Sequence, residues 1–128
     1  MVSGAVVCIV DDDESVRESL TGLLRSIGLA PRPFASAEEF LSGWDRASTT
    51  CLILDVTMPG MSGAELQEYL LSLGEAPPIV FITARTEETL RSRLLERGAI
   101  ACLVKPFPED DLLQAVFAAI RTKNEGSP

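Results

Sequence analysis

A chain of 128 residues in which 46% are apolar is long enough to bury the core of one folded domain. Its 19 acidic and 11 basic residues give a formal charge of −8, which argues against binding to nucleic acid, because proteins hold the phosphate backbone chiefly through Lys and Arg. The sequence contains no histidine, so a histidine base, a histidine metal ligand and a phosphohistidine are excluded from this chain.

Five short apolar runs predict strands, and the segments between them predict helices. The predicted strands are, in chain order, Ala5 to Val10, Pro31 to Phe34, Cys51 to Leu54, Ile79 to Ile82 and Ile100 to Val104. Between them, apolar residues recur at helical spacing, for example from Val16 to Ile27, from Leu66 to Leu73 and from Leu112 to Ile120. Strand and helix therefore alternate along the whole chain.

The predicted helix ends agree with this periodicity. Ser36 with Glu39, and Ser62 with Glu65, have the spacing of capping boxes at helix starts. Gly28 and Gly98 fall where helices are expected to end. The short segment from Gly60 to Gly63 indicates no more than a turn before a helix.

The alternation of apolar strands with helices predicts an α/β fold. Such strands form a doubly wound parallel sheet covered by helices on both faces. Pro31 and Pro33 cannot donate ladder hydrogen bonds, so the second strand is expected at the edge of the sheet. We expect one domain over residues 1–121, followed by a polar linker or C-terminal tail over residues 122–128.

The three cysteines and the ends of the chain predict little chemistry of their own. Cys8, Cys51 and Cys102 each lie inside an apolar run, far apart and without C-x-x-C spacing, so we expect them to be small buried hydrophobic residues. No apolar run approaches the roughly 20 residues that span a bilayer, and the first residues lack the pattern of a signal peptide. We therefore expect a cytoplasmic protein without a membrane partner.

Acidic, hydroxyl and cationic residues follow four of the predicted strands. Asp11 to Asp13 come after the first strand, Asp55 after the third, Thr83 ends the fourth and Lys105 follows the fifth. Each one alone is readily explained as a helix cap or a solvated loop residue. Because the carboxyl ends of parallel strands share one edge of a sheet, however, we expect these residues to converge. Converging carboxylates repel one another, and Mg²⁺ is the natural ion to neutralise them.

This set of residues favours phosphoryl transfer. A carboxylate beside a cation, with an ammonium and a hydroxyl in reach, can attack phosphorus and hold the acyl phosphate. Asp55 is the predicted nucleophile because it stands alone at the centre of the sheet. The sequence has neither a G-x-x-x-x-G-K-[ST] loop nor a G-x-G-x-x-G motif for holding ATP, so the donor is expected to be another protein or a small phosphodonor.

Four segments, IVDDDESVRESL, LILDVTMPGMSGAEL, IVFITA and LVKPF, resemble in their order and spacing the receiver domains of bacterial two-component response regulators, over residues 5–121. The resemblance implies a flavodoxin-like sheet of five strands in the order 2-1-3-4-5 with five helices. It also implies a phosphoacceptor rather than an enzyme. The phosphoryl group would come from the phosphohistidine of a sensor histidine kinase, and the domain would promote its own phosphorylation and slow dephosphorylation.

The resemblance also assigns the metal site. It implies that Asp12 and Asp55 bind Mg²⁺ directly, that Asp11 acts mainly through water, and that the backbone carbonyl of Thr57 completes the protein ligands. These four residues are the expected metal-binding set. Asp55 is at the same time the expected phosphorylation site.

The remaining expected roles concern phosphate binding and switching. The resemblance implies that Lys105 binds the phosphoryl group, that Thr83 turns toward it, and that the Lys105-Pro106 peptide bond is cis, an isomer that X-Pro bonds tolerate. Two positions depart from the usual pattern. Cys102 stands where a Tyr or Phe is common, and Arg85 places a bulky cation at the mouth of the site. Both leave the switching mechanism and the phosphate lifetime open.

The sequence segments SAEEFL, MSGAEL and VKPF are most similar to the corresponding segments of nitrogen-fixation-type regulators. These generally continue into a helix-turn-helix DNA-binding domain of the LuxR type. The resemblance thus implies control of transcription through an output domain not present here, together with homodimer formation on phosphorylation.

Three alternatives remain at this point. A haloacid-dehalogenase-type phosphohydrolase also uses an Asp nucleophile and Mg²⁺, and Asp11 to Asp13 partly match its D-x-D start. A receiver-like interaction module would bind partners without phosphorylation, although every residue needed for phosphorylation is present. A flavin-binding module has a similar topology, but its phosphate would meet an acidic edge.

Overall fold

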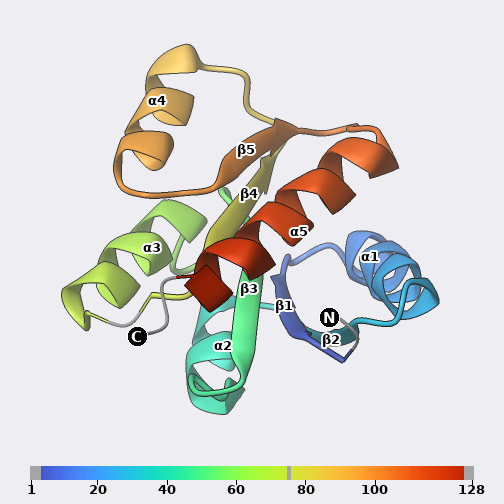
Figure 1. The fold of residues 1–128 in the computed structure, drawn as a ribbon. Helices are drawn as coiled ribbons and strands as arrows, with labels where there is room; N and C mark the ends of the chain where they lie inside the picture. The colour runs from blue at the N-terminus through green and yellow to red at the C-terminus, as the bar shows by residue number, and fades with distance from the viewer. Residues whose placement is uncertain (1–3, 75, 126–128) are drawn as a thin grey trace.

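A computed structural model describes residues 4–74 and 76–125. Within these ranges, five strands and five helices alternate along the chain (Figure 1). The strands are β1 (Val6–Val10), β2 (Ala30–Phe34), β3 (Thr49–Asp55), β4 (Ile79–Thr83) and β5 (Ala101–Val104). The helices are α1 (Glu14–Ser26), α2 (Ala37–Gly43), α3 (Gly63–Ser72), α4 (Glu88–Glu96) and α5 (Glu109–Glu125). The predicted alternation is confirmed.

The strands form one parallel sheet in the order β2-β1-β3-β4-β5. This is the flavodoxin-like, doubly wound order expected from the sequence. Strand β2, which contains Pro31 and Pro33, lies at the edge as predicted. Strand β3 lies at the centre and is paired with β1 on one side and β4 on the other, so its carboxyl end faces both neighbours.

The helices cover the sheet on both faces, and each face has its own apolar core (Figure 1). Side chains of α1 and α5 pack against one face, where Leu24 and Val116 are fully buried. Helices α2, α3 and α4 cover the other face through residues such as Phe40 and Leu66. Each fully buried aliphatic or aromatic side chain contributes roughly 1.5–3 kcal/mol of stabilisation, so the two cores fix the sheet that carries the site.

Local sequence signals determine where the helices begin and end. At α3 the capping box is complete, since Ser62 Oγ accepts from the Glu65 amide and the Glu65 carboxylate accepts from the Ser62 amide. At α2, Ser36 accepts from the Glu39 amide, but Glu39 Oε1 accepts from the Ala35 amide at 3.4 Å instead. The predicted capping box at Ser36 is therefore only half formed.

Two boundaries lie further out than the apolar pattern indicated. Strand β3 begins at Thr49, whose side chain is buried and donates to the Asp45 carbonyl at 2.7 Å. Helix α5 continues to Glu125, four residues past the expected end of the domain at residue 121. The assignment of residues 122–128 to a linker stays a prediction, and residues 126–128 lie outside the described ranges.

Candidate phosphoryl-transfer site

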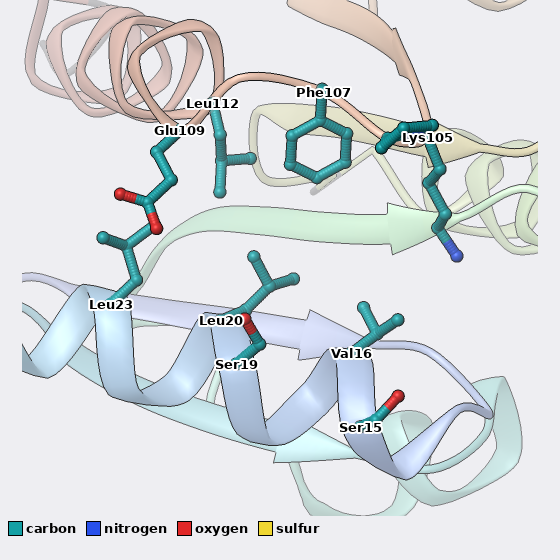
Figure 2. Close-up of a pocket in the computed structure, with 10 residues that line it drawn as sticks. Ser15, Val16, Ser19, Leu20, Leu23, Lys105, Phe107, Glu109 and Leu112 are labelled. Atoms are coloured by element: carbon teal, nitrogen blue, oxygen red, sulfur yellow. The ribbon is translucent and has the colours of Figure 1, made fainter.

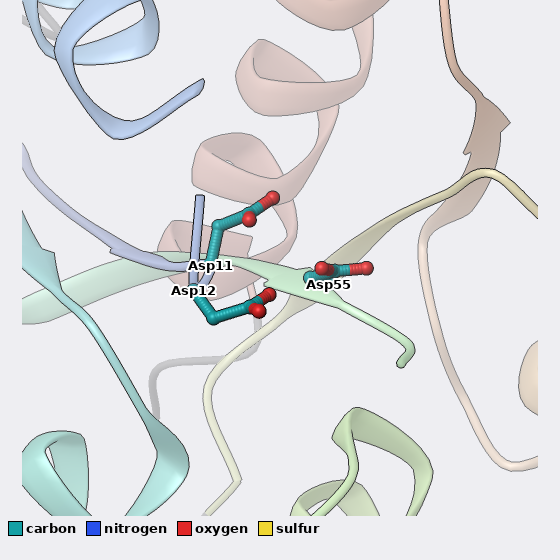
Figure 3. Close-up of side chains that lie close together, drawn as sticks. All are labelled: Asp11, Asp12 and Asp55. Atoms are coloured by element: carbon teal, nitrogen blue, oxygen red, sulfur yellow. The ribbon is translucent and has the colours of Figure 1, made fainter. Parts of the chain in front are cut away.

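Three carboxylates meet at the carboxyl end of the sheet (Figure 3). Asp11 follows β1 and is fully buried, Asp12 comes next and is exposed, and Asp55 ends β3 with 6% of its surface exposed. One carboxylate oxygen from each lies within 4.8 Å of the others. The register explains the meeting, because Val10 at the end of β1 pairs with Leu54, directly before Asp55.

Lys105 completes the cluster from β5. Its Nζ lies 2.9 Å from Asp11 Oδ2 and 3.7 Å from Asp55 Oδ2. The Lys105-Pro106 peptide bond that follows is cis, as expected. The second oxygen of Asp11 accepts a hydrogen bond from the Asp13 amide at 2.9 Å. Lys105 thus contacts both Asp11 and Asp55, and side chains that follow or end β1, β3 and β5 meet in one cluster.

The electrostatics of this cluster favour a cation. Burial and, after it, the negative charge of Asp11 raise the pKa of Asp55 from 3.8 to about 6, although the charge of Lys105 opposes them. For Lys105, burial lowers the pKa, but the hydrogen bond to Asp11 and the charge of Asp55 outweigh it, so the pKa is raised. One ammonium therefore faces more than one carboxylate, and the cluster is left with negative charge to neutralise.

The donor set fits Mg²⁺. Three carboxylates close together offer oxygen ligands only, which is the chemistry that a hard divalent cation selects. Asp55 Oδ1 accepts from the Thr57 amide at 3.3 Å, so the loop that follows β3 folds back on the site. The backbone of Thr57 thus lies next to Asp55, and ligation by its carbonyl stays a prediction.

Thr83 ends β4, beside β3, and is 1% exposed. Its Oγ1 accepts a hydrogen bond from the Arg85 amide at 2.9 Å, so its hydroxyl is bound within its own turn. On β5 its register partner is Val104, the residue before Lys105. The guanidinium of Arg85 forms an ion pair with Glu87 at 3.2 Å, and both side chains are about half exposed. The positive charge that Arg85 places at this edge is thus partly neutralised by Glu87 of the same loop.

All three cysteines are free and buried, which confirms the prediction that they are small core residues. Cys102 lies on β5 opposite Phe81 of β4, and it is 6% exposed. It packs in the core beneath α2, α3 and α4.

Two contacts at this site were not anticipated from the sequence. Arg17 of α1 donates from Nη1 to the backbone carbonyl of Asp11 at 2.7 Å and so fixes the turn between β1 and α1. Gly63, at the start of α3, packs so closely that a Cβ there would overlap the backbone carbonyl oxygen of Asp55. The second glycine of the G-M-S-G segment, Gly63, was a sequence signal for this close approach. The sequence spacing of Arg17 gave no signal for its contact with the Asp11 carbonyl.

A central parallel sheet whose carboxyl edge carries two Asp, one Thr and one Lys side chain defines a receiver domain. The model of the response regulator receiver domain matches residues 7–117, and the chain belongs to that family. Receiver domains of this kind are signalling components of two-component systems. Membership of this family favours a receiver domain over the phosphohydrolase and flavin-binding alternatives.

The relatives that match along the chain include proteins named as response regulators and as transcriptional regulatory proteins. The chain is 44% identical to the response regulator protein TodT of Pseudomonas putida F1 over 117 residues, 91% of this chain and 52% of TodT. It is 36% identical to the transcriptional regulatory protein FixJ of Azorhizobium caulinodans over 121 residues, 94% of this chain and 57% of FixJ. The likeness to FixJ agrees with the expected similarity to nitrogen-fixation-type regulators. The chain spans about half the length of these relatives.

Among solved structures, the response regulator StyR superposes with a TM-score of 0.88 at 45% identity. The superposition covers 94% of this chain and 61% of the StyR chain. No helix in residues 4–74 or 76–125 is long and apolar enough to cross a membrane.

Proposed function

We propose that Asp55 accepts a phosphoryl group from the phosphohistidine of a sensor histidine kinase in a Mg²⁺-dependent reaction. The observation that carries this proposal is the position of the buried Asp55 carboxylate at the central strand end, 3.7 Å from Lys105 Nζ and with an oxygen within 4.8 Å of one of Asp11. A buried acid with a raised pKa beside a cation is a frequent feature of reactive sites.

In the proposed step, a carboxylate oxygen of Asp55 attacks phosphorus while the phosphorus–nitrogen bond of the donor breaks and its electron pair returns to the imidazole. Lys105 neutralises charge that develops on the phosphoryl oxygens, since its ammonium already lies within 3.7 Å of Asp55. Asp11, Asp12, Asp55 and the Thr57 carbonyl would hold Mg²⁺, which supplies further charge neutralisation when bound. The acyl phosphate is later hydrolysed slowly by water, so the domain acts as a switch and not as a turnover enzyme.

Thr83 is the proposed switch residue. To reach a phosphoryl group on Asp55, its hydroxyl would turn away from the Arg85 amide that it now accepts from. That movement would disturb the turn leading into α4, where Glu87 makes no side-chain capping bond. Phosphorylation would then shift a pre-existing population of conformations at α4, β5 and α5.

The kinase would dock at a groove between α1 and α5 (Figure 2). The groove is about 610 Å³ in volume and is lined mainly by apolar side chains, among them Val16, Leu20, Leu23 and Phe107. Lys105 lies at one end of it, so a helix bound there would bring a phosphohistidine close to Asp55. This groove supports a protein donor over a free small molecule as the physiological source.

The output of the switch belongs to the same proposal. Control of transcription through a further domain is proposed from the name of FixJ, a transcriptional regulatory protein, and from the greater length of the relatives. Homodimer formation on phosphorylation and the DNA-binding nature of that domain are proposed from the resemblance to nitrogen-fixation-type regulators. We expect that this domain alone does not bind nucleic acid, because its formal charge is −8. The cytoplasmic location expected from the sequence stays a prediction.

Incubation with acetyl phosphate and Mg²⁺, followed by intact-mass spectrometry, tests the proposal. We expect one added phosphoryl group that survives acid and is lost in base, as an acyl phosphate requires. Labelling should fail in an Asp55→Asn variant and fall sharply with a chelator. Equal labelling of that variant would reject Asp55, and labelling that a chelator leaves unchanged would reject the metal.

A further inference from the structure

A side chain from α2 holds the loop that follows the proposed phosphoacceptor. We call residues 56–62, between Asp55 and α3, the acceptor loop. Glu38, in the first turn of α2, accepts a hydrogen bond on Oε2 from the Met61 amide at 3.1 Å. The same oxygen lies 3.0 Å from where a Cβ of Gly60 would stand. Gly60 has a φ of 75°, so the loop turns directly against this carboxylate.

The other end of the acceptor loop is fastened to the site itself. The Thr57 amide donates to Asp55 Oδ1 at 3.3 Å, and the Gly63 amide donates to the Val56 carbonyl at 2.8 Å. Met58, between these ends, is buried in the core that also contains residues of α2. The path of the loop past Asp55 therefore depends on a few contacts, and Glu38 supplies the one at its far side.

Glu38 acts on the acceptor loop through the position of its carboxylate oxygen more than through its charge. The charges that shift the pKa of Asp55 are those of Asp11, Lys105 and Asp12. Glu38 is exposed to solvent, where a single charge is strongly screened. Its distinguishing feature is an acceptor oxygen placed at the Met61 amide.

We propose that Glu38 is a positioning residue, which holds the acceptor loop so that Thr57 presents its backbone carbonyl beside Asp55 for metal binding. The proposal rests on the Mg²⁺ site of the proposed function. Without this anchor the loop samples other conformations, and the apparent dissociation constant for Mg²⁺ rises in inverse proportion to the fraction of molecules that remain competent.

Calorimetric titration of Mg²⁺ into the described chain and four variants tests this role. Glu38→Ala should weaken Mg²⁺ binding by about tenfold, the lower end of the range for lost outer-shell partners of a metal site. Glu38→Gln keeps an acceptor oxygen at the same reach and should bind nearly as tightly as the parent. Glu38→Asp keeps the charge but is one methylene too short, so it should resemble Glu38→Ala. Glu39→Ala removes the same charge one residue away, leaves the loop contact intact and should change little.

Two further measurements separate positioning from general destabilisation. Hydrogen exchange of the Met61 amide, without metal, should speed up in the Ala and Asp variants while amides of β3 stay protected. If the contact serves stability alone, the free energy of unfolding should fall in Glu38→Ala but not in Glu38→Gln, while both variants bind Mg²⁺ as tightly as the parent, and that result would overturn the positioning role.

The outcomes distinguish the two proposals. If the parent chain fails to bind Mg²⁺, the proposed function and this inference both fall. If the parent binds but Glu38→Ala binds equally well, only the positioning role of Glu38 is overturned. A Glu38→Gln variant as weak as Glu38→Ala would also overturn it, because charge would then be the cause.

Discussion

Replacing Asp55 by Asn should stabilise the metal-free protein at neutral pH. Burial, together with the charge of Asp11, raises the pKa of Asp55 from 3.8 to about 6 despite the opposing charge of Lys105. A shift of about two pKa units corresponds to an ionisation penalty of about 3 kcal/mol once the carboxylate is fully charged. Asn keeps the shape of the side chain and an oxygen that can accept from the Thr57 amide, so the variant removes mainly the charge.

The pH dependence of this gain follows from the direction of the shift. A carboxyl whose pKa is raised on folding holds its proton more tightly in the folded state. Its ionisation therefore lowers the stability of the parent chain as the pH rises from about 4 to about 6, and the loss is constant above that window. Urea unfolding in the presence of a chelator should show equal stability of parent and variant near pH 4. The variant should be more stable by about 2–3 kcal/mol near pH 8.

The matched control is Asp12→Asn, which removes a charge from the exposed member of the cluster and should give a smaller gain. Adding Mg²⁺ should stabilise the parent by mass action and narrow the difference from Asp55→Asn. An Asp55→Asn variant no more stable than the parent near pH 8 would refute the electrostatic account of this site.

Three further perturbations test separate parts of the site. Asp12→Ala should weaken Mg²⁺ binding by about tenfold or more in a metal titration, as expected for a lost ligand, and an unchanged affinity would remove Asp12 from the metal site. Lys105→Ala should leave Mg²⁺ affinity equal or higher, because a competing cation is gone, yet slow phosphorylation by acetyl phosphate; unchanged rates would contradict its role. Ser19→Arg, which places a bulky cation in the groove between α1 and α5, should slow phosphotransfer from a histidine kinase without slowing acetyl phosphate labelling. Ser26→Arg at the end of α1 is its control, and equal effects of the two would argue against docking in the groove.

The fold was predictable from the sequence because apolar strands buried on both faces leave a strong pattern. Cys51 to Leu54 and Ile79 to Ile82 are continuous apolar runs, which are typical of strands buried on both faces of a covered sheet. The meeting of Asp11, Asp55 and Lys105 followed from one rule, since parallel strands end at the same edge. The start of β3 at Thr49 was missed because a buried hydroxyl, bonded to a backbone carbonyl, does not register as apolar.

The supporting contacts of the site could not be predicted in the same way. Arg17 and Glu38 lie on amphipathic helices, where a charged residue that reaches a backbone group has the same spacing as one that faces solvent. Their partners are a carbonyl and an amide, which every residue possesses. The length of α5 was missed for a related reason, because residues 122–125 are polar and add nothing to the helical periodicity.

The most direct test of the account is to identify which carboxylate carries the phosphoryl group. Reduction of the phosphorylated chain with borohydride converts an aspartyl phosphate to homoserine, and peptide sequencing by mass spectrometry then locates it. The account predicts homoserine at position 55 alone, and only after incubation with Mg²⁺ and the phosphodonor. Homoserine at Asp11 or Asp12, or its absence throughout a chain that has gained a phosphoryl group, would contradict the central claim.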